Sequence, residues 1–381
     1  MLVQTKKTDD FSVTGPDGKW KKAVVAVRPA LEELRLRSYR GRKKLLFSSA
    51  WLPGDWLSRV NKANPDIVHL FWVNGGFLRI EHLKHVNRPI VWTLHDMWPF
   101  TGGCHYDDEC GAFRESCGQC PLLNSEQEQD LSRKVWSRKK ASWSNVPMVI
   151  VATSHWLADM ARASSLFRDQ RIEVIPNGID TDKYKPLDKA AARAAYNLPQ
   201  DKRLILFSAV NAVSDKRKGG QFLIPALQSL AANGWSDSAE LVIIGASRPE
   251  IPLDLGLPVH YVGHLHDEIS QVLLYSAADV VVAPSVQENL SNTVLEALAC
   301  GIPVVAFDVG GMPDMIDHQS NGYLATPFQV DDLVNGIAWV LENDVRHGLL
   351  SKTARDIVLD RYDLPKIAKR YSELYESITL L

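Results

Sequence analysis

Two glutamates separated by seven residues, Glu288 and Glu296, occur in the stretch VQENLSNTVLEALACG. A carboxylate in a loop, such as that of Glu288, can accept hydrogen bonds from the hydroxyl groups of a sugar. The N–H groups at the start of the helix that follows can bind a diphosphate. Glu296 has a second interpretation, because Thr293-x-x-Glu296 matches a capping box, which satisfies those N–H groups without a ligand. The stretch predicts a site for a phosphorylated sugar. Whether Glu296 binds the ligand or caps the helix stays open from the residues alone.

A cluster of cations precedes a pair of glycines earlier in the same half of the chain. Lys216, Arg217 and Lys218 come before Gly219-Gly220, where a helix is expected to begin. Cations beside the free N–H groups of a helix start suit an anionic phosphate. Surface lysines before a helix are also common, and the segment lacks the G-x-x-x-x-G-K-[ST] pattern of a Walker A loop. Standing alone, the cluster is a weak indication of a phosphate site.

A histidine and an aspartate end an apolar run in the first half of the chain. The run PIVWTLHDMW reaches His95-Asp96 at the expected carboxyl edge of a parallel sheet, where a ligand would lie. A single histidine in such a place is more often structural than functional. From the residues alone, His95 stays open between the two roles.

Four of the five cysteines follow within the same stretch, with the spacing C-x5-C-x6-C-x2-C. Only the last pair has the C-x2-C spacing of a zinc knuckle, although four thiolates fit tetrahedral zinc in type and number. Disulfides or free thiols are the alternatives, and an iron–sulfur or catalytic role is the remaining one. The candidate ligands of a structural zinc ion are therefore Cys104, Cys110, Cys117 and Cys120.

Short β-branched runs alternate with longer amphipathic stretches, a pattern typical of strands and helices around a parallel sheet. A chain of 381 residues exceeds what one hydrophobic core usually organises, so two domains are expected. The polar stretch Thr181–Lys202 follows a turn-like Pro-Asn-Gly and is predicted as the linker. The expected strands are Lys44–Ser48, Asp66–Phe71, Pro89–Leu94, Met148–Ala152 and Ile172–Ile175, then Leu204–Phe207, Leu241–Ile244, Val259–Val262, Val280–Ala283 and Val304–Phe307.

Composition excludes several classes of protein. The formal net charge of −2 gives no field that gathers nucleic acid, so no nucleic-acid partner is expected. The apolar runs are of strand length, and the first residues lack the pattern of a secretory signal. The cytosol is therefore the expected compartment, and disulfides are disfavoured there. The basic segment Arg35–Lys44 is read as a solvated helix face, with a contact to anionic lipid as the alternative.

The run from Glu288 to Glu296, followed by ACGIPVVAFDVGGMPDMI, resembles the E-x7-E signature of family-4 retaining glycosyltransferases. IPNGID at 175–180, RKG at 217–219 and LVIIG at 241–245 resemble the same family in the same order. The segment FTGGCHYDDEC with CGQCP is similar to a subgroup from bacterial polysaccharide pathways, of the exopolysaccharide or colanic-acid type. The resemblance implies an α/β protein with the GT-B fold, in which two Rossmann-like domains face each other across a cleft.

The resemblance also implies a role for each matching residue. Arg217 and Lys218 match the basic pair on the donor diphosphate, and Glu288 matches the glutamate that faces the donor hexose. Glu296 matches the glutamate that holds the ribose hydroxyls, and His95 a histidine that reaches the donor sugar. The frequent Gly-Arg pair of the family is replaced here by Ser208-Ala209. The implied donor-binding loop consists of Asn289, Leu290, Ser291, Asn292 and Thr293.

By this resemblance the chain transfers a hexose-type sugar from a UDP- or GDP-sugar to a glycan or a polyprenyl-diphosphate-linked acceptor, with retention of configuration. Protein cations stabilise the leaving diphosphate, so no metal or other cofactor is required for catalysis. The expected place of action is the cytoplasm, with peripheral contact to the inner face of the membrane. The implied domains are an acceptor-side domain over 1–180, a linker over 181–202 and a donor domain over 203–381, whose last helix is expected to return to the first domain.

The beginning of the chain departs from the family pattern. Family members start with a strand, a glycine-rich loop and a helix, whereas MLVQTKK is similar to their second strand region. About one strand-loop-helix unit is therefore expected to be absent from the first domain. This leaves a second function open, a truncated and non-catalytic subunit that binds a sugar nucleotide or serves as a scaffold. Another GT-B enzyme, such as an epimerase or a phosphorylase, is the third alternative.

Overall fold

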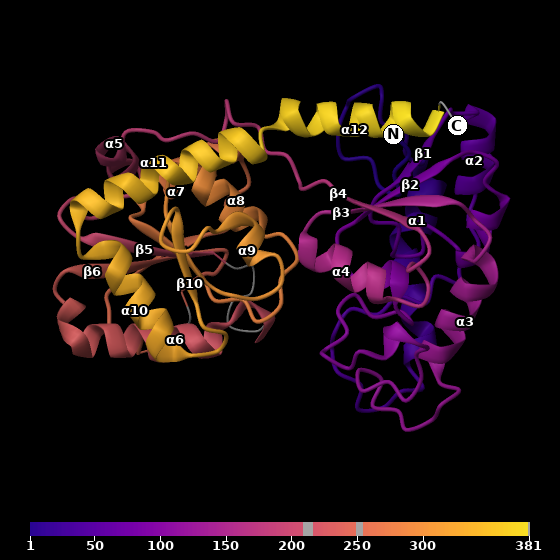
Figure 1. The fold of residues 1–381 in the computed structure, drawn as a ribbon, viewed down its shortest axis with the longest axis horizontal. Coiled ribbons are helices and arrows are strands. Elements are labelled where there is room, and N and C mark those ends of the chain that lie inside the picture. Colours follow the sequence, from indigo (N-terminus) through magenta and orange to yellow (C-terminus); the bar gives the residue numbers. More distant parts are fainter. Residues whose placement is uncertain (209–215, 249–253, 380–381) are drawn as a thin grey trace. The chain divides into compact units, whose positions relative to one another are not determined.

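The computed structural model describes residues 1–208, 216–248 and 254–379. The chain divides into two compact units (Figure 1). Unit 1 consists of Met1–Ile175 with Glu373–Leu381, and unit 2 consists of Pro176–Ser372. The stretch Thr181–Lys202, predicted as a linker, belongs to unit 2 and contains a helix. The division comes before it because Ile179 is already hydrogen-bonded to Tyr362 and Leu364 of unit 2.

Unit 1 is built on a four-stranded parallel sheet with the order β1-β2-β3-β4. All five side chains of β2 are buried, as expected for a strand covered on both faces. Trp92 of β2 packs edge-on against Trp143 of α3, with ring centroids 5.4 Å apart. The elements of this unit are α1 (Lys19–Glu32), η1 (Glu33–Leu36), α2 (Trp56–Ala63), β1 (Val68–Leu70), η2 (Ile80–His85), β2 (Ile90–Leu94), η3 (Trp98–Phe100), η4 (Ala112–Arg114), α3 (Leu131–Trp143), β3 (Met148–Ala152), α4 (His155–Ala163) and β4 (Arg171–Val174).

Unit 2 is built on a six-stranded parallel sheet with the order β10-β9-β8-β5-β6-β7. Its elements are α5 (Lys189–Ala195), β5 (Arg203–Ser208), η5 (Lys216–Lys218), α6 (Gly220–Leu230), η6 (Ala231–Trp235), β6 (Ala239–Ile244), β7 (Val259–Gly263), α7 (Glu268–Ala277), β8 (Val280–Ala283), α8 (Asn292–Ala299), β9 (Val304–Phe307), α9 (Met312–Met315), β10 (Gly322–Ala325), α10 (Val330–Leu341), α11 (Asp344–Arg361) and α12 (Leu364–Thr379), whose last residues group with unit 1.

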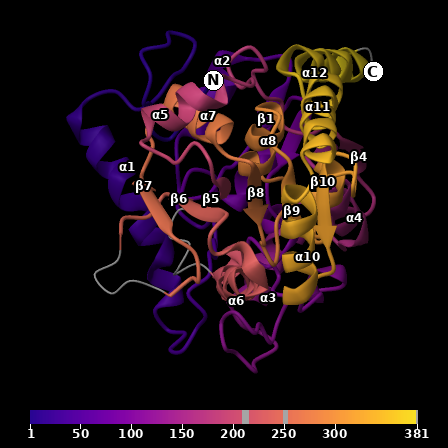
Figure 2. The ribbon, with the colours of Figure 1, turned by 90° about the vertical axis from the view of Figure 1, so that its left-hand side faces the viewer.

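The sheet of unit 2 separates two apolar cores, because successive side chains of a strand point to opposite faces. Leu204 and Leu206 of β5 belong to the core shared with α7, α8 and α11. Ile205 and Phe207 of the same strand belong to the core shared with α6 and α10. Figure 2 shows α6 and α10 below the sheet and α7 and α8 above it. The unit is therefore a doubly wound α/β domain.

Side chains at helix starts fix several helix boundaries. The Asp130 carboxylate accepts a hydrogen bond from the N–H of Arg133 in α3, and the Ser154 hydroxyl accepts one from Leu157 in α4. Asp188, Asp267 and Asn343 cap α5, α7 and α11 in the same way. Each cap satisfies an N–H group that has no partner inside its helix.

Nine of the ten predicted strands coincide with or overlap observed ones within the described residues. Lys44–Ser48 is not a strand. Its Phe47 forms only an isolated antiparallel bridge with Cys104, because this segment pairs with the cysteine-containing loop and not with the sheet. The edge strand β10 was not predicted, since its half-buried GYLA sequence lacks the β-branched run of its neighbours.

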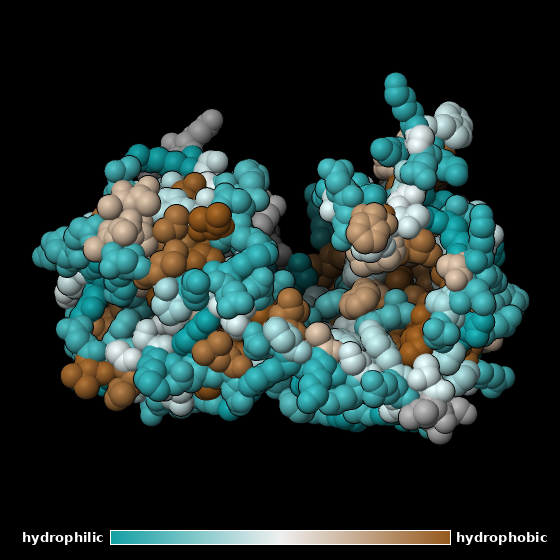
Figure 3. All heavy atoms as spheres, turned by 90° about the horizontal axis from the view of Figure 1, so that it is seen from above, coloured by the Kyte–Doolittle hydropathy of each residue, from teal (hydrophilic) through white to brown (hydrophobic). Residues whose placement is uncertain are grey.

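No helix in the described ranges combines the length and the apolar character that crossing a bilayer requires. The face of the molecule seen in Figure 3 shows apolar residues in separate patches among polar ones. Such scattered apolar surface is normal for folded proteins.

Candidate donor site and the histidine cluster

The predicted phosphate and sugar segments of unit 2 follow two neighbouring strands where the strand order reverses. From β5 the sheet continues through β6 and β7 in one direction and through β8, β9 and β10 in the other. The chain leaves β5 toward η5 and leaves β8 toward the loop with Glu288. Such a reversal opens a crevice at the carboxyl ends of the two strands, and ligands of doubly wound domains bind there.

Lys218 and Glu288 form an ion pair across this reversal. The Lys218 ammonium nitrogen lies 2.9 Å from Oε2 of Glu288, and the two side chains are 36% and 15% exposed. An ammonium group in this position can contact a phosphate, and the carboxylate can accept hydrogen bonds from hydroxyl groups. The structure therefore brings together two of the predicted site residues that are 70 positions apart in the chain.

Two glycines permit this close approach of the loops. Gly219 has φ +76°, and a Cβ on it would lie 1.7 Å from the carbonyl oxygen of Pro284. Gly310 has φ +57°, and a Cβ on it would lie 1.9 Å from the carbonyl oxygen of Glu288. Both the backbone conformation and the lack of space require glycine. Gly219 of RKGG thus lets the backbone pack closely against Pro284, and Gly310 of DVGG lets it pack closely against Glu288.

The capping-box interpretation of Glu296 is wrong. Helix α8 begins at Asn292 with Ser291 as its N-cap residue, so Thr293 is already inside the helix and cannot cap it. Oε2 of Glu296 accepts a hydrogen bond of 2.8 Å from the hydroxyl of Tyr275. Burial raises the pKa of Glu296, and the hydrogen bond from Tyr275 opposes this effect. Glu296 is thus a half-buried carboxylate held by a tyrosine.

The loop before α8 is held firmly in place. Asn289 and Leu290 are buried, with 4% and 7% of their surface exposed. Asn292 is exposed and accepts a hydrogen bond of 3.5 Å from the amide of Asn177, in the IPNGID segment. The side chain of the N-cap residue, Ser291, makes no capping hydrogen bond to α8. The resemblance implies that the first N–H groups of α8 bind an anion.

Arg217 is half-buried, and its carbonyl oxygen accepts a hydrogen bond of 2.9 Å from the N–H of Val286. This bond ties η5 to the Glu288 loop through the backbone. Ala209, where the family pair Gly-Arg is replaced, lies outside the described residues. The structure thus places Arg217 beside the same loop that carries the Lys218–Glu288 pair.

In unit 1, His95 directly follows β2, as predicted. Burial lowers the pKa of His95, while the neighbouring Asp96 acts in the opposite direction. The His95 ring stacks on Phe71, with centroids 6.3 Å apart. A narrow hollow of about 10 Å³, enough for one water molecule, is lined by both rings and by Trp72. His95 therefore presents a largely uncharged ring at the edge of the sheet near neutral pH.

A second histidine, His69 of β1, belongs to the same cluster and was missed from the sequence. Its Nδ1 lies 2.6 Å from the hydroxyl of Tyr375 and its Nε2 2.8 Å from the hydroxyl of Thr93. Its ring stacks on Phe71 at 4.2 Å, on the same phenyl ring that contacts His95. Burial lowers the pKa of His69 to about 4, and His95 adds to the effect. A polar residue inside an apolar strand run was the signal that could have found it.

Asp96 is held by a chain of hydrogen bonds. Its Oδ2 lies 2.6 Å from Nδ1 of His105, and Nε2 of His105 lies 3.0 Å from the hydroxyl of Ser48. Its Oδ1 accepts a hydrogen bond of 2.9 Å from the N–H of Trp98. Ser48 and His105 are both buried. This network fixes the turn that follows His95.

The cysteine-containing loop is anchored by a buried lysine. Lys139 of α3 is fully buried, and its ammonium nitrogen donates to the carbonyl oxygens of Trp98 and Thr101, the latter at 3.0 Å. It also lies 3.7 Å from the centroid of the Trp98 ring, within the range of a cation–π contact. Burial lowers the pKa of Lys139 to about 7.

The cysteines are free thiols in the structure. Burial raises the pKa of Cys117 to about 12 and that of Cys104 well above its ordinary value, so both are protonated near neutral pH. Cys110 is exposed, whereas Cys104, Cys117 and Cys120 are buried. Among the described residues, no group of three or more histidines, cysteines or acids is arranged to hold a metal ion. As placed, the thiols do not fit zinc, and the predicted zinc site stays a prediction.

Comparison with known proteins gives two matching family models. The model described as Glycosyltransferase Family 4 matches residues 11–183, and the model described as Glycosyl transferases group 1 matches residues 202–343. The D-inositol 3-phosphate glycosyltransferase of Saccharomonospora viridis is 28% identical over 203 residues, 49% of this chain and 45% of the relative. That of Mycobacteroides abscessus is 31% identical over 183 residues, 45% of this chain and 39% of the relative. The match thus spans less than half the length of these relatives.

Solved structures share the fold at low sequence identity. Sucrose-phosphate synthase from Thermosynechococcus elongatus has a TM-score of 0.65 and 22% identity, covering 84% of this chain and 76% of its own. A glycosyltransferase from Rickettsia africae has a TM-score of 0.65 and 18% identity, covering 96% and 84%. HepE from Anabaena, solved in complex with UDP, has a TM-score of 0.59 and 20% identity, covering 84% and 82%.

The two family models fall on the two units in the order that the sequence motifs indicate. Each unit carries a parallel α/β sheet, and the solved structures that match are glycosyltransferases of the same architecture. The chain belongs to the group 1, family 4 glycosyltransferases and has the GT-B fold.

Proposed function

We propose that this chain is a retaining glycosyltransferase that transfers a hexose-type sugar from a nucleoside diphosphate sugar to a glycan or lipid-linked acceptor in the synthesis of a surface polysaccharide. The observation that carries the proposal is the Lys218–Glu288 pair at the strand-order reversal of unit 2. A cation and a carboxylate side by side, near the start of a helix whose N-cap side chain makes no capping hydrogen bond, suit a ligand that combines phosphates with hydroxyl groups.

Each site residue has a proposed role in donor binding. The ammonium group of Lys218 and the guanidinium group of Arg217 neutralise the diphosphate as it leaves, together with the N–H groups of the 290–293 segment. Glu288 accepts hydrogen bonds from the hexose, and Glu296 accepts them from the ribose hydroxyls. The Tyr275 hydroxyl occupies only one oxygen of Glu296, so the other oxygen is left for the ribose.

The roles of metal ions and of His95 follow the same reasoning. The protein supplies cations at the diphosphate, so the proposed reaction needs no metal ion. His95, whose pKa burial lowers, positions the donor sugar by a hydrogen bond from an uncharged ring. A structural zinc at the four cysteines is proposed independently of catalysis, and it would require the thiols to move from their places in the structure.

The donor is proposed to be a UDP- or GDP-sugar. HepE from Anabaena, which has the same fold, was solved in complex with UDP and with UDP-glucose. The curated relatives are named for a different acceptor, inositol 3-phosphate, and the match covers less than half of them. The acceptor proposed here is a glycan or a polyprenyl-diphosphate-linked sugar, reached from the cytoplasm with peripheral contact to the membrane.

Turnover of nucleotide sugars by the full chain tests the proposal. Hydrolysis and transfer are measured across a panel of UDP- and GDP-sugars, for the wild type and for Glu288→Gln, which keeps the shape of the side chain and removes its charge. Glu268→Gln is a matched control, because Glu268 forms an ion pair of the same length, 2.9 Å, with Lys183 elsewhere in unit 2. We expect turnover of one donor class, lost only in Glu288→Gln. Donor binding without turnover of any donor would favour the non-catalytic subunit.

A further inference from the structure

Helix α1 turns an apolar stripe toward solvent. Trp20, Val24, Val27 and Leu31 are 81%, 40%, 52% and 40% exposed. At about 100° per residue, their side chains fall within about 60° of one another around the helix. Glu32 is the only residue of α1 that is buried. The helix thus packs lightly on unit 1 and keeps its apolar side uncovered.

The same part of the chain concentrates positive charge. Residues 19–44 contain ten lysines and arginines against two glutamates, a formal charge of +8 in a chain of net charge −2. One of these glutamates, Glu32, is buried and accepts a hydrogen bond of 3.1 Å from the hydroxyl of Ser49. Lys19 lies on one side of the apolar stripe, and Lys21 with Arg28 lies on the other. Cations therefore border the stripe on both sides.

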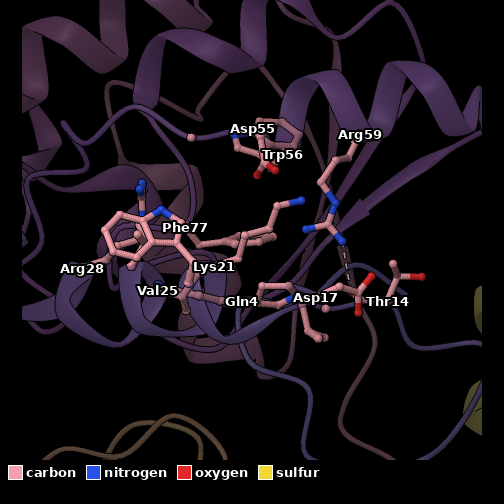
Figure 4. Close-up of a pocket in the computed structure, with 16 residues that line it drawn as sticks. Gln4, Thr14, Asp17, Lys21, Val25, Arg28, Asp55, Trp56, Arg59 and Phe77 are labelled. Atoms are coloured by element: carbon pink, nitrogen blue, oxygen red, sulfur yellow. Dashed lines mark hydrogen bonds between the residues drawn. The ribbon is translucent and has the colours of Figure 1, made fainter.

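A pocket of about 580 Å³ opens beside the stripe, between α1 and α2. Lys21 and Arg59 extend into the same part of it (Figure 4). Arg59 donates a hydrogen bond of 3.3 Å to the carbonyl oxygen of Thr14, and no ion pair is formed by Lys21 within the described residues. Asp17 and Asp55 also line the pocket. Its other polar and aromatic walls come from Gln4, Thr14, Trp20, Arg28, Trp56 and Phe77.

We propose that α1 and this pocket form a surface that docks on an anionic lipid bilayer. The apolar stripe enters the boundary between head groups and acyl chains, where an exposed indole such as that of Trp20 is favoured. The bordering lysines stay at the level of the head groups. The ammonium group of Lys21 and the guanidinium group of Arg59 contact head-group phosphates in the pocket.

The charge pattern favours a bilayer over a protein partner or a soluble anion. A soluble anion would need the cations but not the apolar stripe, and an apolar protein partner would need the stripe but not the cations on both sides of it. An anionic bilayer uses both features at once. The proposal rests on the proposed function in one respect, since docking would bring unit 1 to a lipid-linked acceptor.

Vesicle binding by the full chain tests this proposal directly. Co-sedimentation is measured with vesicles of phosphatidylcholine alone and of equal parts phosphatidylcholine and phosphatidylglycerol. The triple variant Lys19→Gln, Lys21→Gln, Lys22→Gln removes three cations. Each cation raises the partition constant of the protein on anionic vesicles about fivefold at low salt, so the triple variant should bind about a hundredfold more weakly. A second variant, Trp20→Ala with Val27→Ser, should weaken binding at all salt concentrations. The matched controls are Lys185→Gln, Lys352→Gln, Lys366→Gln and, for the apolar change, Ile269→Ser, all exposed in unit 2.

The proposal would be supported if the wild type and both controls bind the anionic vesicles and both α1 variants do not. Absence of binding to anionic vesicles at low salt would overturn it, as would equal binding by the α1 variants and the controls. Self-association of the wild type that Trp20→Ala with Val27→Ser abolishes, without vesicle binding, would assign the stripe to a second copy and overturn it too. Donor hydrolysis without vesicles is measured in parallel, because the α1 variants should leave it unchanged. Vesicle binding without any donor turnover would then count against the proposed function alone.

Discussion

Replacing Gly310 by alanine should displace the backbone of Glu288 and remove donor turnover while the protein stays folded. A Cβ at this position would lie 1.9 Å from the carbonyl oxygen of Glu288, whereas Cβ atoms essentially never come within 3.0 Å of such an atom. The loop must therefore retreat by about 1 Å, and a misplacement of that size in an active site costs about a hundredfold in rate.

The positive φ of Gly310 adds a second effect that has to be separated from the first. Alanine in a left-handed conformation costs roughly 1–2 kcal/mol of stability. Gly234 provides the control, since it has φ +92° and a Cβ on it would meet no atom within 4 Å. Gly234→Ala should thus carry a similar backbone strain without moving any functional group.

Both variants are compared by thermal unfolding and by kcat/KM for the donor that the wild type turns over. We expect a loss of stability in both, larger in Gly310→Ala because the clash with Glu288 adds to the backbone strain, and a loss of about a hundredfold in kcat/KM for Gly310→Ala alone. A Gly310→Ala protein that is folded and stays within about threefold of Gly234→Ala in kcat/KM would refute the reasoning.

Three further predictions follow from the contacts and charges described above. The pKa of His69 falls from 6.5 to about 4 on folding, so the unfolded chain binds more protons than the folded one below pH 6.5. The contribution of His69 to the free energy of unfolding is therefore complete above pH 6.5. This free energy should decrease by on the order of 3 kcal/mol as the pH falls from 6.5 to 4. Chemical denaturation across this range should show a clearly smaller decrease for His69→Gln, and an equal decrease would contradict the assignment. Tyr275→Phe removes the hydroxyl that holds Glu296 and should weaken the binding of the nucleoside diphosphate by about tenfold, because the carboxylate is then no longer fixed in place for the ribose. Calorimetry measures the affinity, and an unchanged value would contradict the role of Glu296. Metal analysis of the purified protein should find one zinc per chain, lost in Cys117→Ser, and a metal-free protein with four titratable thiols in that loop would contradict the zinc proposal.

Much of the fold was predictable because buried parallel strands leave a clear mark in the sequence. The runs at Val280–Ala283 and Val304–Phe307 are continuous, β-branched and of strand length, and both are strands with these bounds. Lys44–Ser48 shows the limit of this signal. Its Leu45 and Phe47 pack into or against the core of unit 1 from a loop, and local sequence does not distinguish that from a strand.

The site was predictable in its composition and not in its contacts. Motif spacing indicated Glu288 and Lys218 separately, but their ion pair depends on two loops that meet only after β5 and β8 have paired. The same holds for Glu296, whose partner Tyr275 is on another helix. The local pattern Thr293-x-x-Glu296 predicted a capping box instead. The N-cap residue of α8 is Ser291, two residues before Thr293, and this excludes the capping box. His69 was missed because its partners Thr93 and Tyr375 come from distant parts of the chain.

Titration calorimetry with UDP and GDP is the most direct test of the central claim that the Lys218–Glu288 site binds the donor. The experiment uses the wild type, Lys218→Ala and the control Lys183→Ala, whose lysine forms an ion pair of equal length, 2.9 Å, with Glu268. The account predicts that the wild type and Lys183→Ala bind one of the two nucleotides with equal affinity, and that Lys218→Ala binds it at least tenfold more weakly, about 1.4 kcal/mol. Equal affinity in all three proteins, or no binding of either nucleotide by the wild type, would contradict it.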